Sequence, residues 1–450
     1  MCHLLLLVIL IGVILVVVLT AVFKLHPFLA LLISAFFVGI ASGMPLLTVV
    51  ENVNTGFGGL MASIGIVIVA GTIIGVILEK SGAAYRMAEV VLRVLGEKRP
   101  QLAMSIIGFI VSIPVFCDSG FIILSSLMKS LAKRSKVKVA SMAVALSTGL
   151  YATHTLVPPT PGPIAAAGNI GASDYLGTII LVGLFVAIPA VIVGYIWAVK
   201  VGTKIDVEAD QELVLDYNEI IKSFGKMPST FKSFLPIVLP IVLIGIGSVA
   251  ALTGSESGFT HFLQFLGAPT VALILGVFSA FLLLPEISEK TLSGWIGDAL
   301  KEAAPILLIT GAGGSFGTVI KNSGVAELLQ KMDLGALSTG ALFLLVPFLI
   351  AAALKTAQGS STASLVITSS LIAPMLPTLG IEGALPLALV VMAIGAGAMT
   401  VSHVNDSYFW VVTQFSGMKV TDAYKAQTMA TLLQGVTTII VTMLLWLIFV

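Results

Sequence analysis

Four short polar clusters interrupt a sequence that is otherwise almost entirely apolar. The first reads Asp118-Ser119-Gly120 and stands between two apolar stretches. Apolar surroundings disfavour a charged carboxylate, so Asp118 is suited to take up and release a proton. The competing interpretation is a helix cap, because Asp-Ser-Gly is common where a helix begins. We expect the functional role, since ionisable residues in such surroundings are costly and usually functional.

The second cluster is rich in proline and follows a histidine. It reads Pro158-Pro-Thr160-Pro-Gly162-Pro163, preceded by His154. Proline removes backbone donors and clashes with the preceding helical turn, so a helix must break here. The freed backbone groups are then available to a ligand. The alternatives are a simple kink or an external loop, and for His154 a histidine satisfied within the core.

The third cluster contains the one cation expected inside a long apolar stretch. It reads Lys355-Thr-Ala-Gln358-Gly359-Ser360-Ser361-Thr362. A helix that begins after Gly359 would add partial positive charge to that of Lys355, and together they would attract an anion. The alternative is that Lys355 reaches an interface or pairs with Asp118 or Asp406.

The fourth cluster, Ser402-His403-Val-Asn405-Asp406-Ser407, interrupts a second apolar helix at a place equivalent to the proline break. His403 is a loose counterpart of His154 there. A run of Asn, Asp and Ser within an apolar helix is rarely only packing, so we predict a role in binding a ligand or a proton. Asp118 and Asp406 are therefore the two candidates for proton coupling.

The composition shows which elements must position these clusters. Of the 450 residues, 58% are hydrophobic and 10% are charged, whereas soluble domains have roughly 25% charged residues. The chain is therefore expected to be an all-α polytopic membrane protein embedded in a lipid bilayer. A net charge of +1 without a basic stripe excludes a nucleic-acid partner. Two cysteines and no ligand spacing argue against a disulfide framework, a metal site or a cofactor, and no enzyme motif is present.

Apolar runs of the length that crosses a bilayer, roughly 17–25 residues, define the predicted spans. They lie at 4–23, 28–46, 60–78, 176–198, 235–253, 269–285, 304–320 and 427–449, and the longer segments 139–173 and 386–416 are predicted broken helices. The stretch 101–128 has basic residues on both flanks and is too short for two crossings. We therefore expect a re-entrant hairpin that enters from the cytoplasm.

Shifting the chain by 242 positions superposes Pro27 on Pro269 and Gly71 on Gly313. This predicts two inverted-topology repeats, 1–199 and 235–450, each with five transmembrane helices and one re-entrant hairpin. Broken helices meet at the midplane in such transporters. The expected divisions are scaffold helices 1–78 and 235–320, hairpins 101–128 and 337–375, broken helices 139–173 and 386–416, helices 176–198 and 427–449, a cytoplasmic linker 200–234, outside loops at 47–59, 170–175, 254–268 and 374–386, and both termini in the periplasm.

At these clusters the sequence resembles the gluconate permease (GntP) family of proton symporters over nearly the whole chain. The matching stretches are His26-Pro-Phe-Leu-Ala-Leu-Leu32, Gly311-Ala-Gly-Gly-Ser-Phe-Gly317, Pro158-Pro-Thr-Pro-Gly-Pro163, Gly359-Ser-Ser-Thr362 and Ser402-His-Val-Asn-Asp-Ser407. The resemblance implies a homodimer in which a transport domain moves against a scaffold, and a substrate such as gluconate or, in some members, D-serine. Well-known gluconate members have a His where Thr160 stands and Glu-Val-Gly where Asp118-Ser-Gly120 stands.

The leading prediction is a secondary transporter that imports gluconate or a related sugar acid across the bacterial inner membrane by proton symport, not an enzyme. The alternatives are sodium as the coupling ion, a symporter for D-serine or another small hydroxylated amino acid and, from a different class, an antiporter or a channel. The predicted substrate-binding residues are Asp118, Ser119, Gly120, His154, Thr160, Gly162, Lys355, Gln358, Gly359, Ser360, Ser361, Thr362, His403, Asn405, Asp406 and Ser407.

Overall fold

The computed structural model describes residues 2–96, 98–207, 227–252, 257–324, 340–404 and 406–450. These residues form helices joined by turns and contain no β-strand. The first half contains α1 (Cys2–Ala21), α2 (Pro27–Ala41), α3 (Leu46–Leu60), a π-helical turn (Met61–Gly65), α4 (Ile66–Lys80), α5 (Ala83–Leu95), α6 (Pro100–Val111), α7 (Cys117–Ser135), α8 (Val139–Leu156), α9 (Pro161–Asn169) and α10 (Leu176–Lys200).

The second half has a similar order of helices. It contains α12 (Thr230–Leu252), α13 (Gly258–Gly267), α14 (Pro269–Ala280), a π-helical turn (Lys290–Trp295), α15 (Ile296–Lys321), α17 (Leu345–Gln358), α18 (Ser361–Ile372), α19 (Ala384–Met399), α20 (Ser407–Ser416), α21 (Val420–Ala423) and α22 (Met429–Phe449). Short 3-10 turns precede α10 at Ser173–Tyr175 and α17 at Ala341–Leu344.

Six helical segments in the described part of the chain are long and apolar enough to cross a membrane. A seventh is obtained if α13 and α14 with its following turn, which are bent by 64° at Ala268, count as one span. Other apolar helices, such as α2 and α6, are shorter than a full crossing. The structure therefore has the helical membrane architecture predicted from composition, while the count of five crossings in each half stays a prediction.

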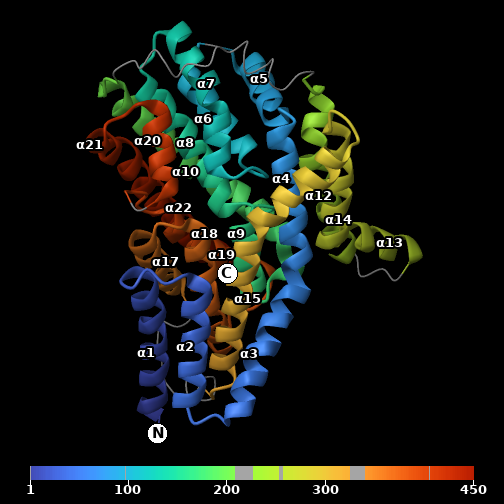
Figure 1. The fold of residues 1–450 in the computed structure, drawn as a ribbon, viewed down its shortest axis with the longest axis vertical. Helices are drawn as coiled ribbons and strands as arrows, with labels where there is room; N and C mark the ends of the chain where they lie inside the picture. Colours follow the sequence, from blue (N-terminus) through green and yellow to red (C-terminus); the bar gives the residue numbers. More distant parts are fainter. Residues whose placement is uncertain (1, 97, 208–226, 253–256, 325–339, 405) are drawn as a thin grey trace.

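The outside loop predicted at 47–59 is wrong. This segment is helical as α3 and continues through the π-helical turn into α4, so that Leu46–Lys80 is one helical segment (Figure 1). The loop was predicted because this segment separates the apolar runs 28–46 and 60–78. Gly56 is needed for packing instead, because a Cβ atom on it would lie 2.4 Å from the carbonyl oxygen of Gly314 on α15. The outside loop predicted at 254–268 is also wrong in part, since α13 occupies most of it.

The element bounds follow the shift of 242 residues. Segment 46–80 corresponds to Lys290–Lys321, α6 to α17 with its preceding turn, and α8 to α19. The two long helices run antiparallel, because Lys80 pairs with Asp298 at one end and Asn322 donates a 2.8 Å hydrogen bond to Asn52 at the other. Inverted repeats require this relation between corresponding helices. The core lies around α8 and α19, whose residues are almost all buried and which lead into the two breaks.

Candidate functional site

A cavity of about 270 Å³ lies where the two hairpin tips meet the ends of the two broken helices. Segments far apart in the sequence contribute its walls: the starts of α7, α18 and α20 and the end of α8. The lining residues are Phe116, Cys117, Asp118, His154, Gln358, Gly359, Ser360, Ser361, Thr362, Asp406, Ser407 and Tyr408. Ser360 and Ser407 are exposed, so the cavity is open to the surroundings.

Local sequence explains why the chain turns at the cavity. Gly359 ends α17 with a φ of +80°, a backbone conformation that favours glycine. The hydroxyl of Ser360 then accepts a 3.1 Å hydrogen bond from the amide of Ala363 and caps α18. Asp406 does the same for α20, because its Oδ1 accepts a 3.1 Å hydrogen bond from the amide of Tyr408. The second hairpin tip and the second break therefore each contain a helix start.

Three helices begin at the cavity wall, and their first residues line it. They are α7 with Cys117, α18 with Ser361 and α20 with Ser407. The amide groups in the first turn of a helix lack intrahelical partners, and the helix dipole adds partial positive charge at that end. The cavity therefore combines three positive helix ends with the carboxyl groups of Asp118 and Asp406.

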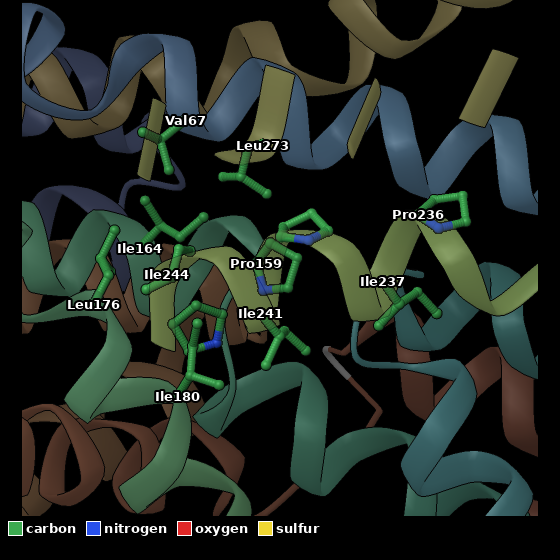
Figure 2. Close-up of a pocket in the computed structure, with 12 residues that line it drawn as sticks. Val67, Pro159, Ile164, Leu176, Ile180, Pro236, Ile237, Ile241, Ile244 and Leu273 are labelled. Carbon is green, nitrogen blue, oxygen red and sulfur yellow. The ribbon is translucent and has the colours of Figure 1, made fainter. Parts of the chain in front are cut away.

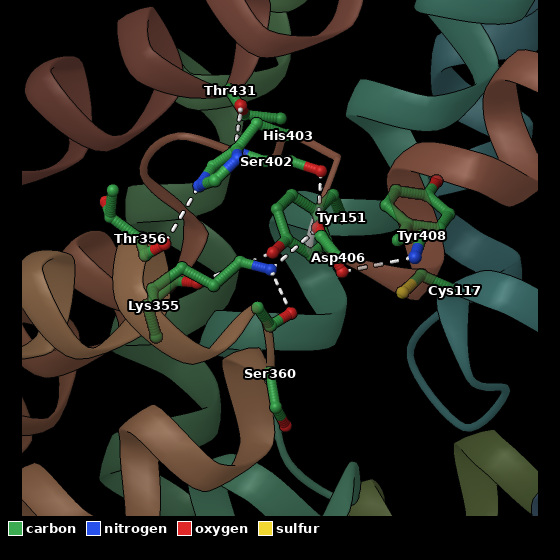
Figure 3. Close-up of polar contacts among 12 residues, drawn as sticks. Cys117, Tyr151, Lys355, Thr356, Ser360, Ser402, His403, Asp406, Tyr408 and Thr431 are labelled. Atoms are coloured by element: carbon green, nitrogen blue, oxygen red, sulfur yellow. Dashed lines mark hydrogen bonds and ion pairs between the residues drawn. The ribbon is translucent and has the colours of Figure 1, made fainter. Parts of the chain in front are cut away.

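Lys355 is fully buried and pairs with Asp406 (Figure 3). Its Nζ lies 2.6 Å from Oδ2 of Asp406 and donates a 2.7 Å hydrogen bond to the carbonyl oxygen of Gly359. It also lies 5.8 Å from the ring centroid of Tyr151. An ion pair with Asp406 is one of the alternative roles expected for Lys355 from the sequence. The lysine stands behind Asp406 and does not itself line the cavity.

The surroundings of Asp406 are closely hydrogen-bonded. The hydroxyl of Ser402 donates to Oδ2 of Asp406, and the amide of Ser402 donates a 3.0 Å hydrogen bond to Thr431. Nε2 of His403 lies 2.9 Å from the carbonyl oxygen of Thr356 on the second hairpin. The fourth cluster is thus tied to the second hairpin and to α22 by its own hydrogen bonds.

The first hairpin and the first break differ, because their polar groups face the cavity without partners. In the described part of the chain, Oδ1 of Asp118 and Nδ1 of His154 are buried and make no hydrogen bond, and on the second hairpin the same holds for Nε2 of Gln358. Oδ2 of Asp118 accepts a long, 3.7 Å hydrogen bond from the thiol of Cys117. Buried polar atoms without partners are uncommon in proteins, so these three atoms are candidate ligand contacts.

Several predicted residues lie outside the cavity. The hydroxyl of Thr160 donates a 2.6 Å hydrogen bond to the carbonyl oxygen of Val157. Gly120 packs against Leu150, and Gly162 packs against Leu365 of α18. Ser119, half-buried in the first turn of α7, is not among the lining residues. His403 and Lys355 are not among the lining residues, and Asn405 lies outside the described residues.

The structure also adds residues that were not predicted. Phe116, Cys117 and Tyr408 line the cavity beside predicted residues. Tyr151 stacks with His154 at a centroid distance of 6.4 Å, and Phe116 lies 5.9 Å from the same ring. The spacing of three residues between Tyr151 and His154 places them on one face of α8, so helical periodicity could have identified the tyrosine.

A second, smaller cavity of about 10 Å³ lies beside the proline break (Figure 2). Its walls are apolar residues and prolines of α10, α12, α14 and neighbouring segments, including Pro159, Ile180 and Leu273. This volume is close to that of a single water site. It carries no charged group and is too small for an organic acid. In the described residues, no group of three His, Cys, Asp or Glu side chains could hold a metal ion.

Comparison with known sequences gives matches over nearly the full length. A family model described as GntP family permease matches residues 4–448. The inner membrane permease YgbN of Escherichia coli strain K12 is 34% identical over 97% of both chains. A gluconate permease of Pseudomonas aeruginosa is 33% identical over 92% of this chain and 91% of its own. The D-serine transporter DsdX of Escherichia coli strain K12 is 32% identical over 97% of both chains.

A solved structure shares the fold. The crystal structure of the YdaH transporter of Alcanivorax borkumensis, described as having an unusual topology, superposes with a TM-score of 0.67. The match covers 93% of this chain and 98% of the other, at 16% sequence identity. At this identity the likeness concerns the fold alone.

Proposed function

The chain belongs to the GntP permease family, and from this premise we propose that it imports a small hydroxy-acid anion, gluconate or a related sugar acid, by proton symport. As a member of that family it is a membrane permease and not an enzyme. The observation that carries the proposal is the convergence of three helix starts on a cavity that also contains Asp118.

The charge in the cavity favours an anion when Asp118 is protonated. Lys355 neutralises Asp406 through their 2.6 Å ion pair, so the second hairpin contributes no net charge from these side chains. The ends of α7, α18 and α20 then supply partial positive charge to the substrate carboxylate. An ionised Asp118 would repel that carboxylate, whereas a protonated Asp118 can donate a hydrogen bond to it. Proton binding and anion binding thus support each other, which is the thermodynamic basis of symport.

Hydroxyl groups of the substrate have suitable partners in the same cavity. His154 and Gln358 present unpartnered nitrogen atoms, and the hydroxyl-bearing residues Ser360, Ser361 and Thr362 line the same cavity. Sites that hydrogen-bond substrate hydroxyls reject analogues that lack them, because the buried polar groups would remain unpaired. We expect selectivity for polyhydroxylated acids over simple fatty acids of similar length.

Alternating access follows in this proposal from movement of the hairpins and broken helices, as one body, against the long helices 46–80 and 290–321. The antiparallel arrangement of the two long helices supports inverted repeats, which are typical of such transporters. We include a homodimer, an inner-membrane location and periplasmic termini in the proposal. These follow from the family resemblance and from the distribution of basic residues.

The direct test is uptake by purified protein in proteoliposomes with an imposed pH gradient. We expect accumulation of labelled gluconate or a related sugar acid that saturates with concentration and stops when the gradient is collapsed. Flux that continues in both directions without saturation would instead indicate a channel. No accumulation of any acid in a panel of sugar acids would contradict the proposal.

A small hydroxylated amino acid such as D-serine is the second candidate. The unpartnered Oδ1 of Asp118 supports it, because a carboxylate in the cavity could accept a hydrogen bond from a substrate ammonium group. Competition decides between the two substrates. If D-serine inhibits uptake at lower concentrations than gluconate does, the amino acid is the preferred substrate.

A further inference from the structure

Tyr151 contacts side chains from both halves of the site. It is fully buried in α8, three residues before His154, and so shares a face of that helix with the histidine. Its ring stacks with that of His154 at an angle of 11° and a centroid distance of 6.4 Å. From the second half, Nζ of Lys355 lies 5.8 Å from the centroid of the tyrosine ring, and the ring centroid of Tyr408 lies 5.0 Å from it (Figure 3). One side chain therefore joins the first break to the second hairpin and the second break.

The second half of the site holds the ring of Tyr151 in place. A cation within about 6 Å of an aromatic ring centroid is attracted by the negative charge of the ring face. Lys355 is such a cation, and its own position is fixed by the 2.6 Å ion pair with Asp406. The tyrosine hydroxyl also donates a 3.4 Å hydrogen bond to the carbonyl oxygen of Ala398, in the last turn of α19. Together with the packed ring of Tyr408, these contacts leave the tyrosine ring little freedom to turn.

The orientation of His154 depends on the aromatic rings around it. The histidine lines the cavity, and its ring contacts Tyr151 and also Phe116, at a centroid distance of 5.9 Å and an angle of 52°. A hydrogen bond to one ring nitrogen usually fixes the tautomer and the direction of a histidine side chain. Nδ1 of His154 is buried and has no such partner in the described chain. The stacked ring of Tyr151 therefore sets the plane of the imidazole.

We propose that Tyr151 is a positioning residue that links the buried Lys355–Asp406 pair to His154, so that the imidazole meets a substrate hydroxyl in one orientation. Tyr151 is not among the lining residues and therefore acts through the histidine. The inference rests on the proposed binding of a hydroxy acid and adds the residue that orients one of its contacts. A hydrogen bond weakens steeply when donor and acceptor are misaligned, so a histidine that is free to turn binds the substrate hydroxyl more weakly.

The contacts assign this role to the ring of Tyr151 and not to its hydroxyl. Both the stacking with His154 and the approach of Lys355 involve the ring face, whereas the hydroxyl makes one long hydrogen bond to Ala398. Phenylalanine keeps the ring and removes only the hydroxyl. Leucine is apolar as well, but it has no π face to stack on the imidazole or to attract the ammonium group. The two substitutions therefore separate the proposed role from simple filling of the core.

The test is a double-mutant cycle on the purified protein, read out as the Kd of the tightest-binding acid in a panel that contains gluconate. We expect Tyr151→Leu to raise Kd about fivefold, the loss expected for roughly one neutral hydrogen bond, and Tyr151→Phe to stay within about twofold of wild type. His154→Ala should also raise Kd about fivefold. In that background Tyr151→Leu should change Kd by less than about twofold, because the contact that it positions is already absent.

The matched control is Tyr85→Leu, which removes another fully buried tyrosine, on α5 and outside the cavity. It should lower the unfolding temperature, as loss of a buried ring does, and leave Kd unchanged. Thermal unfolding of each variant is measured on the same preparation as Kd. A loss of stability is thereby distinguished from a loss of binding.

Each outcome decides the inference. Wild-type Kd in Tyr151→Leu or in His154→Ala would overturn it, and so would an equal rise in Kd on adding Tyr151→Leu to wild type and to His154→Ala, which indicates a general structural effect. An equal loss in Tyr151→Phe would assign the effect to the hydroxyl and overturn it as well. If Tyr151→Leu does not fold, the longer side chain of Tyr151→Met replaces it in the same cycle. If wild type binds no acid of the panel, the proposed function itself is wrong.

Discussion

The tips of the two hairpins meet at one cavity, but their charged side chains are held differently. On the second hairpin and second break, Lys355 and Asp406 form a buried 2.6 Å ion pair, and Ser402 donates a further hydrogen bond to the aspartate. On the first hairpin and first break, Asp118 and His154 each present a buried atom without a hydrogen-bond partner in the described chain. The ion pair of the second half is internally satisfied, whereas Asp118 and His154 of the first half, together with Gln358 of the second hairpin, offer polar atoms to the cavity.

The difference separates two tasks that a binding site must perform. A buried ion pair costs several kcal/mol of desolvation and is retained where it holds a defined geometry, so the pair can fix the second hairpin tip against the second break. Unpartnered polar atoms are instead available to a ligand or a proton. We therefore expect substitutions in the buried ion pair to affect stability and transport together, and substitution of Asp118 or His154 to affect transport alone.

The largest effect is expected from Asp406→Asn, which removes the partner of the fully buried Lys355. An unpaired buried charge lowers the free energy of unfolding by about 3–5 kcal/mol. Thermal unfolding in detergent measures the loss, and uptake should be abolished. The double variant Lys355→Met with Asp406→Asn should recover most of the stability, since an apolar side chain of similar length replaces the charge. Lys321→Ala, at an exposed position, is the control. An Asp406→Asn variant as stable as wild type would contradict a structural role for the ion pair.

Asp118→Asn should give the next largest effect and act on transport only. Oδ1 of Asp118 has no hydrogen-bond partner within the described chain, so the free energy of unfolding should change by less than about 1 kcal/mol. Asparagine can donate a hydrogen bond but cannot take up or release the coupling proton, so gradient-driven uptake should fall at least about tenfold, equivalent to about 1.4 kcal/mol. Measurements of unfolding and uptake on the same preparation decide this. If Asp118→Asn lowers the free energy of unfolding as much as Asp406→Asn does, the proposed difference between the two halves of the site is wrong.

Gln358→Met should produce a moderate loss of substrate affinity. Nε2 of Gln358 is buried at the cavity without a partner in the described chain, and methionine keeps the length while removing the amide. One neutral hydrogen bond is worth about 1 kcal/mol, so KM should rise by a factor of about five with an unchanged maximal rate. Gln414→Met on the exposed face of α20 is the matched control. An equal KM in both variants would exclude Gln358 from binding.

The smallest effect is expected from Thr160→Val. The hydroxyl of Thr160 is bonded to the carbonyl oxygen of Val157 and does not face the cavity, so KM should stay within about twofold and stability should fall by about 1 kcal/mol. Thr362→Val, on the cavity wall, should raise KM more than this. A larger KM change in Thr160→Val than in Thr362→Val would contradict this prediction and indicate that the proline break contributes to substrate binding.

Much of the fold could be predicted from local properties of the chain. Proline at 158–163 and glycine at 359 predict the first break and the second hairpin tip, because each restricts or frees the backbone where it stands. The helix over 46–60 could not be predicted in the same way. Glycine has a low helix propensity. Gly56 allows the close approach of Gly314, which lies far away in the sequence, because it has no side chain.

The sequence alone determined that the chain is a helical membrane protein and where its few polar clusters stand. These conclusions depend on composition and on the cost of placing a charge among apolar residues, which any segment carries with it. The tertiary structure decided which of those polar atoms are used internally. Lys355 meets Asp406 while Asp118 and His154 keep free atoms, and Thr160 turns away from the cavity. Hydrogen bonds depend on distances between segments remote in the sequence, so only the folded chain distinguishes an atom already bonded from one available to a substrate.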